Sequence, residues 1–344
     1  MTGVQTCALP ISLGEFGLIG RLSETFENTH PATVKGIGDD AAVIDLGAEY
    51  GLLSTDLLLE GVHFDLTFAP LKHLGYKAIA VNVSDIAAMN GVPGQVTVSL
   101  AVSNRFSVEA LEELYAGIKA ACADFRVDLV GGDLSSSRSG LLISVSVFGK
   151  VAKDKVVYRS GGKANDLLCV TGDLGGAYLG LQILEREKQV FLANPGMQPQ
   201  LEGHDYVIQR QLKPEARMDV IFELAEAGVV PTAMLDVSDG LASDLLHLCS
   251  QSGVGALVFE ENLPIDEQTY LAATELNLSP ITAAMNGGED YELLFSVRQA
   301  DYDQVKNNPK ISVIGYLTAE PNQVLLSSKG GNQVPVTAQG WHHF

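Results

Sequence analysis

Basic residues, paired cysteines and long apolar runs are all scarce or missing in this chain of 344 residues. Lys and Arg total 22 against 42 Asp and Glu, and the formal net charge of −20 disfavours binding to nucleic acid or to an anionic membrane. The four cysteines stand far apart without a CxxC pair, so neither a zinc site nor a disulfide framework is indicated. A reduced cytoplasm fits this cysteine usage best. No apolar run reaches the length of a transmembrane helix.

Common nucleotide-binding and nucleophile motifs are also missing. Residues 172–176 join a predicted strand to a predicted helix, but their spacing is neither GxGxxG nor GxxxxGK[ST]. No Ser-His-Asp order with a nucleophile elbow is present, and no lysine stands in a nucleotide motif. The sequence therefore favours electrostatic and positional chemistry, of which phosphoryl transfer is an example.

The length of the chain and its 46% hydrophobic content predict two domains with a sizeable core. Residues 1–12 lack a basic region and match nothing that follows. They resemble the translation of a sequencing adapter, and we hypothesise that they are a non-native leader. We expect an N-terminal domain at residues 13–153 and a C-terminal domain at residues 154–344.

Hydrophobic periodicity predicts the elements of both domains. In the N-terminal domain we expect helices at 13–27, 71–89 and 108–125, and strands at 41–44, 51–55, 95–102 and 141–148. These elements mix without a strict βαβ repeat, which favours an α+β layer over a doubly wound sheet. In the C-terminal domain we expect an α/β arrangement with strands at 166–171, 234–237, 256–259, 292–297 and 311–316, and helices that include 217–227 and 241–252.

Several segments place a carboxylate beside glycine or a small hydroxyl residue. They are Gly38-Asp39-Asp40, Ser54-Thr55-Asp56, Ser84-Asp85, Gly131-Gly132-Asp133 and Asp236-Val237-Ser238-Asp239-Gly240. Any one of them is typical of a simple turn, because Asp accepts local backbone hydrogen bonds and Gly supplies positive φ. Mg²⁺ takes oxygen ligands, and several Mg²⁺ ions around one nucleotide need carboxylates from separate parts of a fold. The set as a whole predicts a metal and phosphate site.

Asp85 has two interpretations. A continuous helix through residues 76–90 places Asp85 on a face with Ala78, Asn82 and Met89, where a buried carboxylate needs a cation or several donors. Alternatively, the helix breaks near Ser84 and Asp85 is the N-cap of a second helix.

The segment 236–240 and Arg159 are also open to two interpretations each. Asp236 and Asp239 stand three apart where a strand meets a helix, so both can face one ion while free backbone N–H groups meet phosphate oxygens. The alternative is that Ser238 or Asp239 only caps the helix. Arg159, followed by Ser160-Gly161-Gly162, suits phosphate binding, although a solvated arginine fits the local sequence equally well.

Ordered motifs from residue 13 to 344 resemble the thiamine-monophosphate kinase family of the aminoimidazole-ribotide synthetase-like superfamily. They are Gly14-Glu15-Phe16-Gly17-Leu18-Ile19, Gly36-Ile37-Gly38-Asp39-Asp40-Ala41, Ser54-Thr55-Asp56 with His63-Phe64, Tyr76-Lys77-Ala78, Val81 through Met89, Gly131-Gly132-Asp133, Arg159-Ser160-Gly161, Val237 through Leu241, and Gly287-Gly288-Glu289-Asp290-Tyr291-Glu292-Leu293. The resemblance implies a homodimer whose N-terminal α+β domains share a β-barrel, and a C-terminal α/β domain that closes over ATP. The implied reaction is Mg²⁺-assisted transfer of phosphate from ATP to thiamine monophosphate.

The resemblance also implies roles for individual residues. The residues expected to hold several Mg²⁺ ions are Asp40, Ser54, Thr55, Asp56, Asp85, Asp133, Asp236 and Asp239. Gly132, Arg159 and Ser238 are expected to contact ATP, and His63, Glu289 and Trp341 to contact thiamine phosphate. Glu289 can balance the cationic thiamine, and Trp341 can stack on it or, alternatively, pack into the core. No residue is expected to be a covalent nucleophile, although Asp239 is a possible catalytic group.

Other members of the superfamily supply alternative functions. A selenophosphate synthetase is expected to carry a reactive Cys or selenocysteine near its start, where this chain has only Cys7 within the suspected leader. The hydrogenase-maturation relative ends in cysteine, whereas this chain ends Trp341-His342-His343-Phe344. A ribotide synthetase uses ATP on a different substrate. A nucleotide sensor without turnover is a further alternative, which ADP release dependent on thiamine phosphate would distinguish from a kinase.

Overall fold

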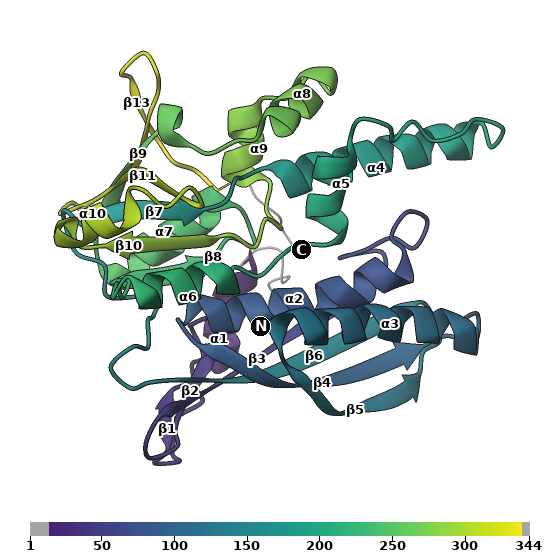
Figure 1. Ribbon diagram of the computed structural model, residues 1–344, viewed down its shortest axis with the longest axis horizontal. Coiled ribbons are helices and arrows are strands. Elements are labelled where there is room, and N and C mark those ends of the chain that lie inside the picture. Colours follow the sequence, from purple (N-terminus) through teal and green to yellow (C-terminus); the bar gives the residue numbers. More distant parts are fainter. Residues whose placement is uncertain (1–13, 339–344) are drawn as a thin grey trace, which may run out of the picture.

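The computed structural model describes residues 14–338, which form two sheets that lie side by side with helices between and around them (Figure 1). The suspected leader and Trp341 lie outside the described residues. Among the described helices, none is long and apolar enough to cross a membrane.

The first sheet has the strand order β1-β2-β3-β6-β4-β5. Its strands are β1 (Thr33–Lys35), β2 (Ala42–Asp45), β3 (Tyr50–Leu59), β4 (Val92–Val102), β5 (Asp128–Ser136) and β6 (Leu141–Val151). All neighbours are antiparallel except the parallel pair β4 and β5. The helices of this half are α1 (Gly14–Ser23), α2 (Leu71–Ala88) and α3 (Val108–Phe125).

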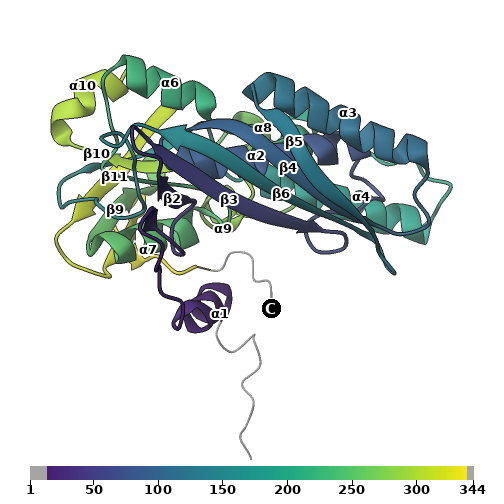
Figure 2. The same cartoon turned by 90° about the horizontal axis from the view of Figure 1, so that it is seen from below.

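Helices α2 and α3 pack closely against each other over one face of this sheet (Figures 1 and 2). Two glycines permit the close approach, because a Cβ on Gly75 would lie 2.0 Å from the carbonyl oxygen of Leu114, and one on Gly117 would lie 1.8 Å from that of Lys72. Alternate residues of β6 are buried beneath the helices, as a half-covered sheet requires. The packing leaves α2 almost fully enclosed.

The other face of the sheet carries no described helix (Figure 2). It exposes apolar side chains, among them Leu57 on β3, which is 48% exposed, and Leu134 on β5, which is 64% exposed. The pairing of β2 with β3 ends at Leu53, so the rest of β3 has an open edge, as does β5. Both features are unusual on a monomer surface.

The second sheet has the strand order β13-β12-β9-β11-β7-β10-β8. Its strands are β7 (Leu167–Thr171), β8 (Ala233–Asp236), β9 (Gly255–Phe259), β10 (Leu293–Val297), β11 (Ile311–Thr318), β12 (Val324–Ser327) and β13 (Gln333–Pro335). Its helices are α4 (Gly176–Ala193), α5 (Asp205–Leu212), α6 (Met218–Glu226), α7 (Leu241–Ser252), α8 (Glu267–Glu275), α9 (Pro280–Asn286) and α10 (Tyr302–Val305). Only β9 and β12 pair in parallel, so the expected α/β half is a mixed, largely antiparallel sheet.

Two local expectations change. Gly131-Gly132-Asp133 was expected at a turn, but it lies inside β5, where a Cβ on Gly132 would be 1.9 Å from the carbonyl oxygen of Val98 on the neighbouring strand. Helix α2 continues unbroken through Ser84 to Ala88, so Asp85 stands in its last turn and is not an N-cap. The expectation that Asp85 lies partly buried on the face of a continuous helix is therefore confirmed.

Candidate active site

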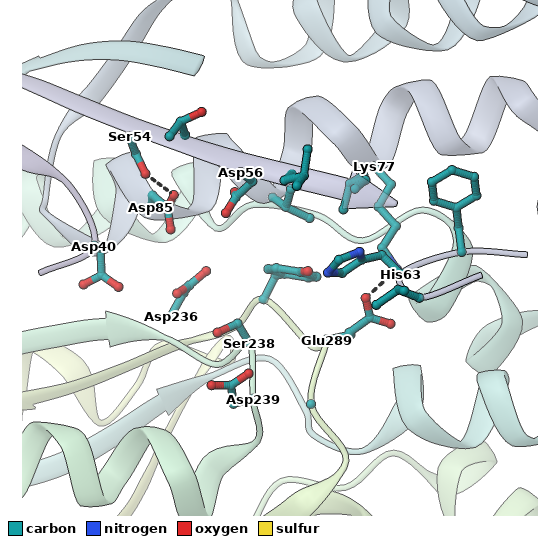
Figure 3. A pocket seen from close by; sticks show the side chains of 18 of the residues that line it. Asp40, Ser54, Asp56, His63, Lys77, Asp85, Asp236, Ser238, Asp239 and Glu289 are labelled. Carbon is teal, nitrogen blue, oxygen red and sulfur yellow. Dashed lines mark hydrogen bonds and ion pairs between the residues drawn. The ribbon is translucent and has the colours of Figure 1, made fainter. Parts of the chain in front are cut away.

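A pocket of about 1440 Å³ lies between the two halves of the molecule (Figure 3). Strand β3 and helix α2 supply one wall, and helix α4 with the loops after β8 and α9 supplies the other. The residues that the pocket brings together include Asp40, Ser54, Asp56, His63, Asp85, Arg159, Asp236, Ser238, Asp239 and Glu289. Four of the five carboxylate segments thus converge on one pocket, whereas the segment 131–133 does not line it.

The acidic cluster of Asp40, Asp56, Asp85 and Asp236 lies at one end of the pocket (Figure 3). Ligand oxygens of Asp40, Asp85 and Asp236 all lie within 4.8 Å of one another. Asp236 ends β8, and Asp85 reaches the same point from α2. Carboxylates held so close together repel one another unless protons or cations neutralise them.

Burial and mutual repulsion raise the pKa values throughout the acidic cluster. Burial, together with the charge of Asp40, raises the pKa of Asp56 to about 6 and that of Asp236 to about 7. Burial and the charges of Asp56 and Asp236 raise the pKa of Asp85 well above its usual value. Ionising these acids is therefore costly, and cations would stabilise the charged forms.

Two hydroxyl groups and one arginine support the acids. Ser54 donates a hydrogen bond of 2.5 Å to Asp85 Oδ2, and Ser84 donates one of 2.6 Å to Asp236 Oδ2. Arg159 Nη2 lies 2.6 Å from Asp40 Oδ1 and its side chain is only 17% exposed, so it is not a solvated arginine. Burial raises the pKa of Asp40 despite this partner. Asp40 Oδ2 is buried without a hydrogen-bond partner, which fits a site for a cation.

The turn after β8 places a glycine at the N-cap of α7. The N-cap residue of α7 is Gly240, at φ 108°, and no side chain caps it. Ser238 and Asp239 instead line the pocket next to the acidic cluster. The N-cap of α7 is therefore Gly240 and not Ser238 or Asp239.

A strained loop carries Glu289 at the other end of the pocket. Glu289 and Tyr291 adopt φ 58° and 53°, a left-handed conformation that costs on the order of 1 to 3 kcal/mol per residue. Their backbone N–H groups donate to the carbonyl oxygens of Ser238 and Val237 at 2.7 and 2.9 Å. These bonds tie the loop to the turn that holds Ser238 and Asp239.

The carboxylate of Glu289 has protein partners on both oxygens. Lys77 Nζ lies 3.0 Å from Oε1, and Gln211 Nε2 donates to Oε2 at 2.7 Å. His63 lies beside this pair, and its Nδ1 accepts a hydrogen bond of 3.0 Å from the backbone N–H of Leu59 (Figure 3). We refer to His63, Lys77, Gln211 and Glu289 as the Glu289 end of the pocket.

Some predicted site residues stand apart from the acidic cluster. The hydroxyl of Thr55 faces the opposite side of β3 from Ser54 and Asp56, and it donates 2.9 Å to the carbonyl oxygen of Val145. Gly132 and Asp133 are exposed on β5 and do not line the pocket within the described chain. Trp341 lies outside the described residues.

Sequence reasoning assigned no role to Lys77, Gln211 or Ser84. The spacing could have placed Lys77 near the site, because it stands eight residues before Asp85 and so lies on the same broad face of α2. The contacts of Gln211 with Lys77 and Glu289 join segments far apart in the chain, so no local pattern predicts them.

Two family descriptions match the chain. Residues 38–151 match the family described as AIR synthase related protein, N-terminal domain, and residues 163–327 match AIR synthase related protein, C-terminal domain.

Individual relatives match over nearly the whole chain. A protein named thiamine-monophosphate kinase from Aquifex aeolicus (strain VF5) is 34% identical over 96% of this chain and 98% of its own length. One of the same name from Bacillus subtilis (strain 168) is 33% identical over 96% of this chain and 100% of its own. A solved structure described as AaThiL complexed with AMPPCP and TMP is 33% identical, with a TM-score of 0.84 over 99% of this chain and 100% of that one.

Proposed function

Because this chain belongs to the thiamine-monophosphate kinase family, we propose that it transfers a phosphoryl group from ATP to thiamine monophosphate and makes thiamine diphosphate. The observation that carries the proposal is the acidic cluster, with ligand oxygens of Asp40, Asp85 and Asp236 within 4.8 Å of one another beside Arg159. Such an arrangement suits charge neutralisation around transferring phosphates.

We propose that several Mg²⁺ ions bind at the acidic cluster. The residues that would hold them are Asp40, Ser54, Asp56, Asp85, Asp236 and Asp239, with Thr55 at the margin. Bound Mg²⁺ neutralises the negative charge of the phosphates as one is transferred. The fit rests on the unpartnered Asp40 Oδ2 and on the raised pKa values of the acids, which a cation would lower.

The nucleotide and the acceptor occupy different ends of the pocket in this proposal. Arg159 and Ser238 would contact the phosphates of ATP next to the acidic cluster, and His63 and Glu289 would hold the thiamine part of the acceptor. The acceptor phosphate then lies between the two ends. Its oxygen attacks the γ-phosphorus in line as the bond to the β-phosphate oxygen breaks, and ADP leaves.

The activity is tested by incubating the purified protein with ATP, Mg²⁺ and thiamine monophosphate, and by separating the products chromatographically. We expect thiamine diphosphate and ADP in equal amounts, and ADP release that needs thiamine monophosphate. Unphosphorylated thiamine is the matched control, because it offers no phosphate as acceptor. ADP release that ignores thiamine monophosphate would reject the kinase and favour another ATP-using enzyme, while no release at all would favour a sensor.

The direct transfer is tested separately, by quenching the reaction with radiolabelled ATP during turnover. We expect no labelled protein, since the described lining of the pocket offers carboxylates for metals and contains no cysteine thiol. A phosphorylated enzyme that forms and decays at the rate of turnover would overturn the direct mechanism, with Asp239 as the first residue to examine.

We also propose a cytoplasmic homodimer whose N-terminal domains share a β-barrel, with the domain boundary near residue 153. Support comes from the open edges of β5 and of β3 beyond Leu53, and from the exposed Leu57 and Leu134. A second subunit with its β5 laid along this edge of β3 would bring the partner subunit's Asp133 towards Ser54 and Asp56. That arrangement would give Gly132 and Asp133 their expected roles.

The dimer is tested by light scattering at micromolar concentration, where we expect twice the chain mass of 36.6 kDa. Leu57→Lys should yield a monomer with little activity, because a charge on the apolar face opposes its burial. Val108→Lys is the matched control, since Val108 is 69% exposed on α3, away from that face. A fully active wild-type monomer would reject the proposal.

A further inference from the structure

The Glu289 end of the pocket is electrically balanced before any substrate arrives. Lys77 Nζ lies 3.0 Å from Glu289 Oε1 and 3.1 Å from the carbonyl oxygen of Gln211. The Lys77 side chain is 5% exposed and that of Glu289 is 28% exposed, so the ammonium is hidden and the carboxylate faces the cavity. One positive and one negative charge in contact leave little net field for a third group.

The carboxylate of Glu289 is also fixed in orientation. Lys77 holds one oxygen, and the side chain of Gln211 holds the other at 2.7 Å. The backbone of Glu289 is pinned by its bond to Ser238 and by its left-handed φ of 58°. An ionised carboxylate has about four acceptor positions, so after these two contacts it can still accept from a ligand at defined angles.

Lys77 is placed to act on the organic part of a substrate and not on the phosphate that reacts. It lies on the same face of α2 as Asp85, eight residues earlier, which corresponds to about 12 Å along the helix axis. The ammonium points away from the acidic cluster towards Glu289 and His63 (Figure 3). Its contacts with Gln211, at the end of α5, also join the two halves of the molecule.

Thiamine monophosphate offers two features for this end of the pocket to recognise. Its thiazolium ring carries a positive charge, and its pyrimidine ring carries an exocyclic amino group that donates hydrogen bonds. A bare carboxylate would attract the charge. A carboxylate already neutralised by a buried lysine contributes little binding free energy through the charge of the thiazolium. It still binds a correctly placed hydrogen-bond donor favourably.

We propose that Lys77 is a specificity-determining residue. By neutralising Glu289, it makes this carboxylate recognise the amino group of the substrate through a hydrogen bond instead of acting as a counterion for the thiazolium. This inference rests on the proposed kinase function. Lys77 acts through Glu289, so it is a positioning residue, and it has no part in the transfer step.

The test compares three acceptors with the wild-type enzyme at saturating ATP and Mg²⁺. They are thiamine monophosphate, its analogue with a 4′-oxo group in place of the amino group, and its analogue with a neutral thiophene ring in place of the thiazolium. We expect kcat/KM to fall at least about 100-fold for the 4′-oxo analogue, because a buried acceptor loses its donor, and less than about tenfold for the neutral-ring analogue. The reverse order would overturn the proposal.

Variants at Lys77 sharpen the comparison. Lys77→Met keeps the length of the side chain and removes its charge, so Glu289 becomes an uncompensated anion. We expect the penalty for the neutral-ring analogue to grow at least about tenfold, mainly in KM, while kcat with thiamine monophosphate changes less. Lys77→Arg should restore much of the wild-type pattern. Lys72→Met, the same substitution at an exposed site on α2, should leave the pattern unchanged.

The outcomes separate this inference from the proposed function. If the wild-type enzyme makes no thiamine diphosphate, the kinase function is rejected. If it does but tolerates the 4′-oxo analogue, or if Lys77→Met leaves the ratio between analogues unchanged, only the role of Lys77 is rejected. If Lys77→Met does not fold, the comparison of the three acceptors with the wild-type enzyme still tests the proposal.

Discussion

The two ends of the pocket handle charge in opposite ways. At the acidic cluster, Arg159 pairs with Asp40 as the one ion-paired cation among the described residues, and the pKa values of Asp56 and Asp236 rise to about 6 and 7. At the Glu289 end, every charged contact is matched within the protein, because Lys77 meets Glu289 at 3.0 Å. The first end is therefore incomplete without cations, whereas the second is complete and can select by hydrogen bonding.

The largest expected effect comes from the incomplete end. Asp85→Asn keeps the shape of the side chain and an acceptor for Ser54, which now donates at 2.5 Å, but it removes the charge. We expect kcat at saturating Mg²⁺ to fall at least about 100-fold, in line with the loss of one preorganised electrostatic group. Steady-state kinetics with thiamine monophosphate measures this fall in kcat.

The fold should survive Asp85→Asn, and its melting temperature should rise in metal-free buffer because one repulsive charge is gone. The exposed Asp154 provides the control, since Asp154→Asn should change neither quantity. Turnover close to wild type would mean that Asp85 does not act on the transferring phosphate.

A smaller effect is expected from Arg159, the cation of the acidic cluster. Arg159→Gln removes the partner of Asp40, which lies 2.6 Å away and has no exposed side-chain surface. We expect the free energy of unfolding in metal-free buffer to fall by about 2 kcal/mol, because a buried charged group loses its hydrogen bond. Urea denaturation with and without Mg²⁺ measures the change, and Mg²⁺ should recover part of it.

Arg298→Gln is the control for Arg159, since the Arg298 side chain is 64% exposed and such pairs contribute little. An equal loss of stability with and without Mg²⁺ would show that Arg159 and Mg²⁺ do not stabilise the same carboxylates.

The pH dependence of stability is expected to be smaller still. Because the pKa values of Asp56 and Asp236 are raised to about 6 and 7, the folded protein binds protons more tightly than the unfolded chain. Their contribution is fully present below pH 4 and is lost as the pH rises through 6 to 7. We expect metal-free protein to lose at least about 1 kcal/mol between pH 4.5 and 7.5.

Mg²⁺ should suppress this loss, because bound cations favour the ionised acids, and Asp85→Asn should reduce it. Asp65 acts in the opposite direction. Partial burial raises its pKa, but hydrogen bonds from Lys188 and Thr67 outweigh this and lower the pKa to about 2, so its contribution is lost only as the pH falls below 4. Stability that rises from pH 4.5 to 7.5 without metal would contradict the charge imbalance.

The smallest effect is expected at the outer rim of the pocket. Lys188 on α4 lies 2.6 Å from Asp65, but both side chains are more than 20% exposed, at 21% and 26%. Lys188→Met should change KM for thiamine monophosphate by less than about threefold, because partly exposed pairs contribute roughly 0.5 kcal/mol. Asp65→Asn should give the same result. A tenfold change from either would extend substrate recognition beyond the Glu289 end.

The sequence predicted the elements whose pattern is local. The helices at 108–125 and 241–252 coincide with α3 and α7, because their apolar spacing and flanking residues define both ends. Strand β5 was missed, since its two glycines resemble a turn and all its residues are exposed. Gly132 permits a close approach to β4, which no local pattern reveals.

In the candidate site, too, the sequence predicted the features that depend on local patterns and missed those that depend on contacts between distant segments. The acids of the cluster were predicted because small neighbours and separate carboxylate motifs point to burial and metal binding. The pairing of Lys77 with Glu289 joins residues of the two halves, and the N-cap of α7 is Gly240 and not Ser238. The roles of all the predicted site residues stay predictions. Gly132 and Asp133 do not line the pocket within the described chain, and Trp341 lies outside the described residues.

Helix α2 carries both Asp85 and Lys77, so with the roles proposed above it would fix the length of the acceptor. In that case the eight-residue spacing of Lys77 and Asp85, about 12 Å along the helix axis, would help to set the gap between the transferring phosphate and the recognised amino group. Moving the lysine one turn nearer the acids, with Lys77→Met and Val81→Lys, would shorten the distance along α2 between the lysine and Asp85 by about 5.4 Å. Together with a carboxylate moved to match, that change would retune the enzyme towards shorter phosphate esters without altering its chemistry.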